Sequence, residues 1–326
     1  MAENAQSEGR LPEGTDSKKA VAVIGSLSMD LVLNVPRLPV AGETISGSTF
    51  NTFVGGKGNN QALAAAKLGA KVSMLGQVGQ DPYGDAVLNN LNANNVDCTY
   101  MLRTPDVGTG IANIWVGPSG ENVIVIIANS NGTLTPALVE ANSKVLDEAK
   151  VLLLQLEIPM ETVIKAAELA KSKGITVVLN PAPAPQDGKL PAELLQNVDI
   201  IVPNETEAMF LTGTMPEDDE SAKDSAHKLL ALGPKSVVLT LGARGALMVV
   251  EGREEFINSF PVQVVDSTAA GDAFLGAMAA GLAQGDPLDK AVKTGCAAGA
   301  LACTKPGAAP SLPDKVALSS LLSTAR

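Results

Sequence analysis

Residues 264–274 read VVDSTAAGDAF, a short strand that runs into a helix whose first turn holds almost no bulky side chain. We take this strand-to-helix junction as the feature that decides the fold. Ser267 or Thr268 is expected to cap the helix, because hydroxyl groups accept hydrogen bonds from the first helical N–H groups. The other N–H groups of the first turn stay unpaired and, together with the helix dipole, predict an anion site.

Asp272 stands in the first turn of that helix. A carboxylate fixed there would lie close to a docked anion and could accept a hydroxyl proton during a phosphoryl transfer. The helix N-terminus and a nearby cation should both lower the pKa of Asp272. The plainer interpretation is that Asp272 only complements the helix dipole, since acidic residues are common in first turns. The rest of the chain has to decide between these two roles.

Upstream of this junction, helical and apolar patterns alternate, which predicts a mostly parallel sheet covered by helices and hence an α/β fold. The first strand is expected at Ala20–Ile24, where a continuous apolar run indicates burial on both faces. Further strands are expected at 71–78, 151–156, 175–179, 199–202, 236–241, 246–250 and 261–265. Helices are expected at 62–68, 81–94, 136–148, 159–173, 205–212, 219–231, 287–302 and 312–322, and from 268 onward.

Two segments behave differently from this alternation. Residues 31–54 and 97–128 contain short strand patterns separated by turns, which indicates a small sheet or its junction with the core. Residues 1–19 are polar and carry charges of both signs, so we expect a disordered leader rather than a signal or transit peptide. Residues 20–326 are then expected to form a single domain into which the two segments are inserted.

The composition narrows the possible partners. The chain has 35 acidic against 24 basic residues, a net charge of −11, and no dense basic run, so no nucleic-acid or membrane partner is expected. A single histidine and three cysteines without metal-ligand spacing argue against zinc sites and His-dependent triads. Free thiols favour a reducing compartment, so we expect a cytoplasmic protein. No apolar run reaches the roughly 18 residues of a membrane span.

Polar residues follow several of the expected strands. In doubly wound sheets, ligands bind beyond the carboxyl ends of the strands, so these residues are expected to meet at one edge. Glu157 is the clearest case, because it ends a strongly apolar strand at the mouth of the sheet. A single acidic residue in such a place is usually a solvated loop residue, whereas several together indicate a site. The others are Asp30, Asn180, Asn204, Glu205, Glu207, Thr240 and Asp272.

The segment GGKG, residues 55–58, precedes another helix. Glycines around Lys57 let backbone amides approach a phosphate or a polyhydroxylated sugar closely. The segment lacks the third glycine of the dinucleotide fingerprint, because position 61 is Gln61, and the chain contains no P-loop sequence. Hydride transfer at a standard NAD site and P-loop hydrolysis are therefore disfavoured. The glycines can alternatively serve as hinge or packing residues.

Three separated motifs occur together in the chain: GGKGNNQA at residues 55–62, NETE at 204–207 and DSTAAGDAF at 266–274. In this order they are similar to the signatures of the PfkB carbohydrate kinases, in particular of the ribokinase branch. The resemblance extends from about residue 20 to residue 322. Further matches are GET at 42–44, LE at 156–157, NPAP at 180–183 and GAAPS at 307–311.

The resemblance implies a three-layer α/β sandwich with a small β-sheet lid, which closes over the sugar and often pairs with a second lid in a homodimer. It implies that ATP phosphorylates D-ribose at the 5-hydroxyl, giving D-ribose 5-phosphate and ADP. Asp272 would be the base that takes the hydroxyl proton. The amides of Ala269, Ala270 and Gly271 would form the anion hole, in agreement with the interpretation of residues 264–274 above.

The same resemblance assigns binding residues. The ribose hydroxyls would be held by Asp30, Gly56, Lys57, Gly58, Asn60 and Glu157, with Ser28 beside them. The nucleotide would lie against Asn204, Thr240, Leu241, Gly242, Ala243, Arg244 and Gly245, with Gly271 and Cys296 nearby. Glu207 would place Mg²⁺ and its water shell.

A monovalent cation, usually K⁺, is also implied beside the anion hole. We expect this cation to set the anion-hole turn without contacting the substrate. Its oxygen ligands, mostly backbone carbonyls, would come from Asp266, Thr268, Ala302, Lys305, Gly307 and Ser311.

Three positions depart from the family pattern. Ser28 replaces an Asn that touches the sugar, residues 129–131 replace a Gly-Ala-Asn run, and Cys296 stands where a His often flanks the adenine. These departures leave open a sister kinase that acts on fructose, deoxyribose or pseudouridine. A non-catalytic sugar or nucleotide sensor is the alternative outside enzymes, and it is disfavoured because Gly271 and Asp272 are both present.

Overall fold

The protein is represented by a computed structural model that describes residues 20–324, so the leader expected at residues 1–19 lies outside the described residues. The strands are β1 Ala20–Ile24, β2 Ser28–Asn34, β3 Thr49–Gly55, β4 Lys71–Leu75, β5 Gln77–Gly79, β6 Val96–Asp97, β7 Leu102–Thr104, β8 Gly110–Val116, β9 Asn122–Ile127, β10 Ala149–Leu154, β11 Thr176–Leu179, β12 Ile200–Ile201, β13 Ser236–Thr240, β14 Ala246–Val250 and β15 Arg253–Ile257.

The α-helices are α1 Lys57–Lys67, α2 Pro82–Ala93, α3 Pro136–Ala141, α4 Met160–Ser172, α5 Ala192–Leu195, α6 Glu205–Thr212, α7 Asp219–Ala231, α8 Ala270–Gln284, α9 Leu288–Ala302 and α10 Lys315–Thr324. Short 3₁₀ turns are η1 Asn129–Thr133, η2 Ser143–Leu146, η3 Gly242–Arg244 and η4 Ala309–Ser311.

A nine-stranded sheet forms the centre of the molecule, in the order β15-β14-β13-β12-β11-β10-β1-β4-β6. Its strands run parallel from β13 to β6, and only the pairings of β14 with β13 and with β15, at one edge, are antiparallel. The alternation of helices and strands therefore predicted the mostly parallel sheet correctly. Because the parallel strands end at the same edge, their following loops converge on one side of the sheet.

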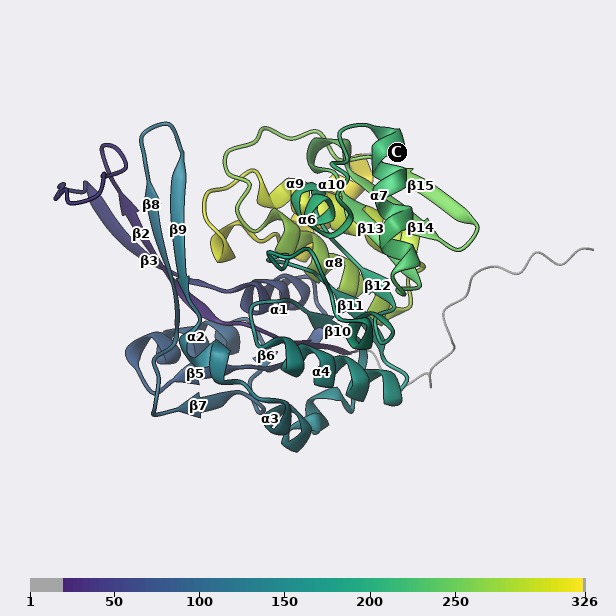
Figure 1. Ribbon diagram of the computed structural model, residues 1–326, viewed down its shortest axis with the longest axis horizontal. Helices are drawn as coiled ribbons and strands as arrows, with labels where there is room; N and C mark the ends of the chain where they lie inside the picture. Colours follow the sequence, from purple (N-terminus) through teal and green to yellow (C-terminus); the bar gives the residue numbers. More distant parts are fainter. Residues whose placement is uncertain (1–19, 325–326) are drawn as a thin grey trace, which may run out of the picture.

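Helices cover both faces of this sheet. In β1, Val21 and Val23 face a core shared with α1, α2, α8, α9 and α10, whereas Ala22 and Ile24 face a core shared with α3, α4, α5, α6 and α7. Every residue of β1 is buried, as expected for a strand covered on both faces. Figure 1 shows these helices packed around the sheet, and the α/β sandwich of three layers is confirmed.

A separate four-stranded sheet, in the order β3-β2-β8-β9, extends to the left of the body in Figure 1. We call it the lid. It takes its strands from residues 28–55, slightly more than the expected segment 31–54, and from residues 110–127, which is less than the expected segment 97–128. The difference arises because β6 joins the central sheet beside β4, and β7 pairs with β5 in a two-stranded sheet.

Three expected elements are wrong. The strand expected at 71–78 is divided at Gly76 into β4, which joins the central sheet, and β5, which pairs with β7. Residues 261–265 do not form a strand, because the backbone N–H groups of Val265 and Asp266 donate instead to the carbonyl of Cys303 (2.8 and 3.2 Å). The sheet edge is formed by β15, which pairs with β14. The helix expected at 136–148 ends at Asn142, whose side-chain Nδ2 donates to the Leu138 carbonyl at 2.8 Å.

Helices α1 and α8 cross at very short range. A Cβ atom built at Gly276 of α8 would lie 2.4 Å from the Ala64 Cβ and 2.8 Å from the Gln61 carbonyl oxygen of α1. Only a glycine fits such a contact, since real Cβ atoms do not approach other heavy atoms below about 3 Å. The crossing places the N-terminal turns of the two helices beside each other, at the edge where the parallel strands end.

Candidate active site

A cavity of about 170 Å³ opens at the carboxyl-terminal edge of the central sheet. Polar residues that follow three of its strands line the cavity: Asn180 after β11, Asn204 after β12, and Thr240 at the end of β13. The starts of α1, α6 and α8 complete the lining with Lys57, Glu207, Ala269, Ala270, Gly271 and Asp272. The structure thus brings together polar groups that lie far apart in the sequence.

The first turn of α8 is capped differently from the expectation. Ala269 is the N-cap residue, in a left-handed conformation (φ 59°), and no side chain caps the helix. Neither Ser267 nor Thr268 serves as the cap, because the Thr268 hydroxyl donates to Asp266 Oδ1 at 2.7 Å. A side-chain cap would satisfy some of the helical N–H groups, so its absence leaves them for a ligand.

Most N–H groups at this helix start lack an acceptor among the described residues. This holds for Ala269, Gly271 and Asp272, whereas the N–H of Ala270 donates to the Ser267 carbonyl at 3.2 Å. A Cβ atom built at Gly271 would meet nothing within 4 Å, so the backbone there faces open space. Unpaired donors at the positive end of a helix dipole, beside an empty volume, fit an anion such as a phosphoryl group.

Asp272 is buried, with 8% of its surface exposed. Two amide groups of α1 hold its carboxylate: Asn60 Nδ2 donates to Oδ2 at 3.1 Å, and Gln61 Nε2 donates to Oδ1 at 3.0 Å. Burial raises the pKa of Asp272 above its usual value, although Lys57 and the two amides oppose that shift. The expected lowering of the pKa is wrong, because the cost of burying the charge exceeds the stabilisation of the carboxylate by Lys57, Gln61 and Asn60.

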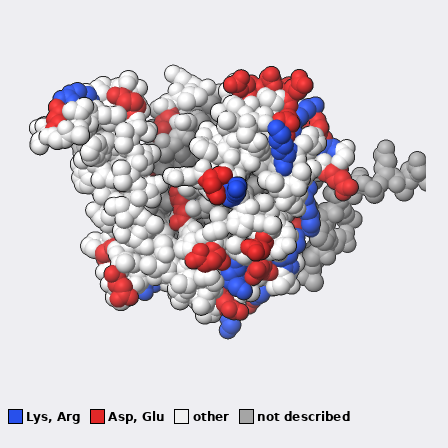
Figure 2. Space-filling view, viewed as in Figure 1, with Lys and Arg blue, Asp and Glu red and all other residues white. Residues whose placement is uncertain are grey.

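Lys57 stands opposite several carboxylates. Burial alone would lower its pKa, but Asp272, Glu157 and Glu207 outweigh burial and raise it, so Lys57 is a firmly held cation. Asp30 also interacts with Glu157 and Asp272. Acidic groups therefore exceed basic ones in this part of the site. Figure 2 shows acidic atoms inside the hollow between the lid and the body.

Glu157 is fixed by the loop after β1 and by the start of α1. Its Oε2 accepts hydrogen bonds from the Ser26 hydroxyl and from the Lys57 N–H (3.0 Å). A Cβ at Gly56 or Gly58 would come within 3 Å of the backbone of residues 25–28. Both glycines are therefore packing residues, and the N–H of Gly58 donates to the Ser26 hydroxyl rather than pointing free (3.3 Å).

Asp30 and Ser28 lie at the root of the lid, in β2. The Ser28 hydroxyl donates to Asp30 Oδ1 at 3.1 Å. Burial raises the pKa of Asp30 to about 6, and the nearby carboxylates of Glu157 and Asp272 add to this shift. Asp30 is thus the acidic group that the lid contributes next to the body.

Asn204 and Glu207 form a reciprocal cap at the start of α6. Asn204 Oδ1 accepts from the Glu207 N–H (2.8 Å), and the Glu207 carboxylate accepts from the backbone N–H and from Nδ2 of Asn204 (both 2.9 Å). Burial raises the pKa of Glu207. The cap holds the Glu207 carboxylate at the cavity wall.

The remaining residues assigned to the nucleotide lie outside this cavity. Thr240 lines it, whereas residues 241–245 do not appear in its wall. Leu241 is buried in the core, and Arg244 bonds to the Pro216 carbonyl beside Glu205. Cys296 is also part of the core, 6% exposed, and burial raises the pKa of its thiol to about 12.

Asp266 joins the loop before α8 to the loop after α9. Its Oδ1 accepts from the N–H of Thr268 (2.9 Å), and its Oδ2 accepts from the N–H of Gly307 (2.8 Å). Among residues 20–324, no group of three or more His, Cys, Asp and Glu side chains is arranged to hold a metal ion. A cation in these loops would therefore depend on backbone carbonyl oxygens, which suit hard cations.

Sequence reasoning missed the residues that hold the site residues in place. Ser26 fixes Glu157, and Gln61 fixes Asp272. Asn131 holds the turn after β1, because its side chain both accepts from the Leu27 N–H and donates to the Leu27 carbonyl (2.9 and 2.7 Å). The available signal for Gln61 was a run of three amide side chains, residues 59–61, at the start of an otherwise alanine-rich helix.

Comparisons with known proteins agree with this geometry. The family model of the pfkB family carbohydrate kinases matches residues 18–315. Ribokinase of Haemophilus influenzae is 40% identical over 298 residues, covering 91% of this chain and 96% of that protein. Ribokinase of Bacillus subtilis is 40% identical over 303 residues, covering 93% of this chain and 99% of that protein.

A solved structure is similar as well. The structure of Arabidopsis thaliana ribokinase, complexed with ribose and ATP, superposes with a TM-score of 0.87 at 33% identity, covering 93% of this chain and 98% of that chain. In the part of the chain that the structure describes, no helix is both long and apolar enough to cross a membrane. The matched length, the motifs and the fold lead to one conclusion: this chain belongs to the pfkB family of carbohydrate kinases.

Proposed function

We propose that the protein transfers the γ-phosphoryl group of ATP to the 5-hydroxyl of D-ribose, giving D-ribose 5-phosphate and ADP. The observation that carries this proposal is the first turn of α8, where Asp272 and the unpaired N–H groups of Ala269 and Gly271 face one cavity. A base and an anion site are the two parts that phosphoryl transfer requires of a protein. The similarity to ribokinases supports ribose as the sugar.

In this mechanism, the oxygen of the 5-hydroxyl attacks the γ-phosphorus while the bond from that phosphorus to the departing ADP oxygen breaks. Asp272 takes the hydroxyl proton. Its raised pKa makes it a stronger base than an exposed aspartate, which favours this transfer. The N–H groups of the first turn of α8 stabilise the negative charge on the moving phosphoryl oxygens.

The ribose would lie between the lid and the starts of α1 and α8. Asp30 would reach it from the lid, and Lys57, Asn60 and Glu157 would reach it from the body. Glu157 Oε1 and Asp30 Oδ2 have no hydrogen-bond donor among residues 20–324, so each can accept from a sugar hydroxyl. Gly56 and Gly58 shape this surface by close backbone packing.

The nucleotide would extend from the cavity past Asn204 and Thr240 toward residues 241–245. The excess of carboxylates around Lys57 fits a divalent cation, and Glu207, held at the cavity wall, would place Mg²⁺ through water. When bound, Mg²⁺ would neutralise the phosphate charges of ATP.

A monovalent cation would sit between the loops that Asp266 joins, with oxygens from Thr268, Ala302, Lys305, Gly307 and Ser311. Its effect would be on the shape of the turn before α8. Replacing K⁺ by Na⁺ is expected to lower the rate while Mg²⁺ stays essential. Equal rates in the two salts would remove K⁺ from the proposal.

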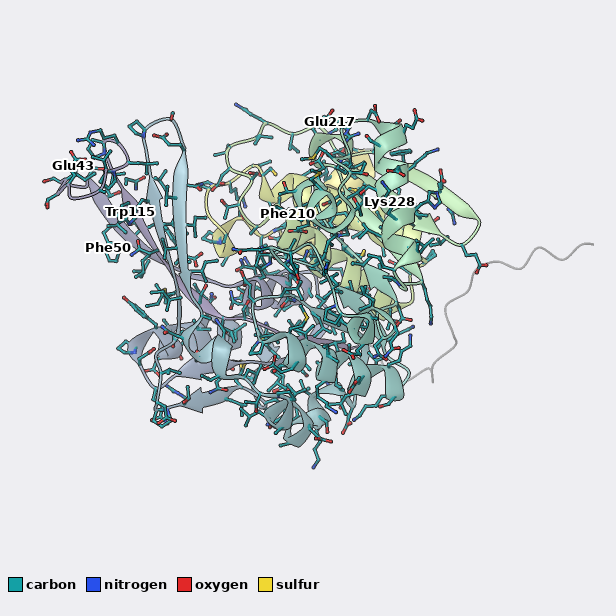
Figure 3. The ribbon with its side chains drawn as sticks, in the orientation of Figure 1. Glu43, Phe50, Trp115, Phe210, Glu217 and Lys228 are labelled. Atoms are coloured by element: carbon teal, nitrogen blue, oxygen red, sulfur yellow. The ribbon has the colours of Figure 1, made fainter. Side chains whose placement is uncertain are left out.

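The lid also supports a homodimer. All residues of β9 are exposed, and Val123, Ile124, Val125, Ile126 and Ile127 have 44–58% of their surfaces in contact with solvent. In Figure 3, Phe50 and Trp115 also belong to the lid, and they are 59% and 36% exposed. An apolar strand at a sheet edge is a ready pairing surface, and the occupant we propose is the lid of a second copy.

The decisive experiment measures ADP release by the purified protein with Mg·ATP and K⁺, comparing D-ribose with fructose, 2-deoxyribose, adenosine and pseudouridine. A selective response to ribose is expected. A stronger response to another compound would overturn ribose but keep the Asp272 mechanism. No response to any of them would overturn the kinase activity and favour a sugar or nucleotide sensor.

A further inference from the structure

The two oxygens of the Asp272 carboxylate have different supports. Oδ2 accepts from Asn60 Nδ2, and the Oδ1 of Asn60 in turn accepts from Asn59 Nδ2 at 3.2 Å. Oδ1 accepts from Gln61, which is fully buried at 0% exposure. Gln61 is the stronger candidate for orienting the base, because its amide is anchored by residues outside α1, whereas Asn60 is anchored by its own neighbour in that helix.

A backbone carbonyl fixes which end of the Gln61 amide faces Asp272. The Val202 carbonyl can only accept, so Asn180 must present Nδ2 to it (3.1 Å) and turn Oδ1 toward Gln61. Gln61 must then present Nε2, which donates to Asn180 Oδ1 at 3.3 Å and to Asp272 Oδ1 at 3.0 Å. The amide of Gln61 therefore has one orientation in which all these groups are satisfied.

Gln155 secures the other end of Gln61. It follows β10, is fully buried, and its Nε2 donates to Gln61 Oε1 at 2.6 Å. Gly25 leaves room for it, because a Cβ built there would lie 2.0 Å from Gln155 Oε1. No described residue donates to that Oε1. A buried amide that leaves one atom unpaired costs stability.

We propose that Gln61 is a positioning residue for the phosphoryl transfer, held by Asn180 and Gln155 so that it fixes the orientation of the Asp272 carboxylate. This inference rests on the proposed role of Asp272 as the base. Gln61 is fully buried, so it acts through Asp272 rather than on the sugar. A chain of buried, mutually oriented hydrogen bonds is suited to such a role, because each bond restricts the next.

None of the charged groups that face Asp272 is hydrogen-bonded to the Gln61 side chain. These charged groups are Lys57 of α1, Glu157 after β10, Glu207 of α6 and Asp30 of β2. The hydrogen bond from Gln61 lowers the pKa of Asp272. Removing this bond should raise that pKa further and move the acid limb of the kcat–pH profile to higher pH.

The test compares Gln61→Met with Gln77→Met as a matched control. Gln77, in β5, is buried like Gln61. Its amide makes one side-chain hydrogen bond, to Thr133 at 3.1 Å, and its Oε1 is unpaired. We expect Gln61→Met to lower kcat by about 10- to 100-fold with KM for ribose changed less than about threefold, and to shift the acid limb upward. Gln77→Met should change stability alone.

Gln155→Met provides a second variant in case Gln61→Met does not fold. It should lower kcat by roughly 2- to 10-fold and shift the acid limb in the same direction, since it loosens Gln61 without removing it. The proposal is overturned if the acid limb stays in place, or if KM for ribose rises as much as kcat falls. Asp272→Asn distinguishes failure of the base assignment from failure of the positioning role. If Asp272→Asn stays active, Asp272 is not the base. If Asp272→Asn is inactive while the Gln61 and Gln155 variants are unaffected, only the positioning role of Gln61 is removed.

Discussion

The floor of the site, by which we mean residues 59–61 of α1 together with Asp272, is buried, whereas one strand of the lid is exposed along its whole length. On the floor, Asn59, Asn60 and Gln61 are at most 6% exposed, and buried hydrogen bonds connect α1 to Asp272 of α8. In the lid, β9 is an edge strand and every one of its residues is exposed, so both of its faces are exposed. Figure 2 shows hardly any charge on this face of the lid except near its tip. The floor is thus held by contacts within one chain, whereas the lid exposes an apolar edge strand.

This contrast separates two sets of expected effects. Changes on the floor should act on turnover, because its groups are fixed relative to the reacting atoms. Changes in the lid should act on sugar affinity and association, because the lid contributes few polar groups and a large apolar surface.

The largest effect is expected for Asp272→Asn. Its kcat should fall by roughly 10²- to 10⁴-fold, because the amide cannot accept the hydroxyl proton. Ribose binding, measured by calorimetry, should be largely retained, since the lost interaction belongs to the transition state. Near-normal turnover would show that Asp272 only complements the helix dipole.

Gly271→Ala tests whether the first turn of α8 must stay open. The new methyl group meets no protein atom within 4 Å, so the fold should be unharmed or gain about 0.5–1 kcal/mol from the lost flexibility of glycine. The methyl group would occupy the space of the phosphoryl group, and kcat should fall by about 10- to 100-fold. Thermal unfolding together with ADP release measures both effects, and an active variant would mean that the phosphoryl group lies elsewhere.

Asp30, in the lid, should make KM for ribose depend on pH. As pH falls below about 6, the pKa of this carboxyl, Asp30 gains a proton and loses its strength as an acceptor, so KM for ribose should rise by several-fold, about 2- to 10-fold. In Asp30→Asn, KM should be high and this pH dependence absent. A wild-type KM that is flat between pH 5 and pH 8 would contradict the assignment.

The same group has a stability effect of known sign. Because the folded-state pKa of Asp30 lies above its ordinary value of 3.8, the folded protein loses stability as pH rises from that value through about 6. Asp30→Asn should therefore raise Tm at pH 8, by roughly 2–6 °C, while leaving Tm at pH 4 nearly unchanged. An equal gain at both pH values would point to altered packing instead.

The smallest effect on turnover is expected in β9. Ile124→Lys and Val125→Lys place a charge on each face of the strand, and at least one should convert a dimer to a monomer in light scattering, with kcat changed less than about threefold. Val316→Lys is the matched control, because Val316 is 79% exposed but belongs to α10. A wild-type protein that is monomeric at tens of micromolar would rule out the lid dimer.

Local patterns predicted the fold and much of the cavity. The alternation of strands and helices, and the polar residues after β11, β12 and β13, depend on short stretches of sequence and fixed sheet geometry. The motif around residues 266–274 placed Asp272 and Gly271 at the cavity. The family resemblance also named Lys57 and Glu207, which line the same space.

Long-range competition explains what the sequence did not reveal. Thr268 was a reasonable cap, but its hydroxyl bonds to Asp266 instead. The bond between Gln61 and Asp272 joins residues 211 positions apart, and no periodic pattern reports such a contact. The lowered pKa of Asp272 was expected from the helix N-terminus and a nearby cation, whereas the direction of the shift depends on burial by the whole fold.

The contact between Gly276 and α1 has a consequence for how this enzyme can change over time. Gly276 carries no polar atom, yet it sets the distance between the helix that bears Gln61 and the helix that bears Asp272. A methyl group there would push the two helix axes apart and lengthen the hydrogen bonds that hold the Asp272 carboxylate. Selection on the reaction rate would therefore act on a position where no chemistry takes place.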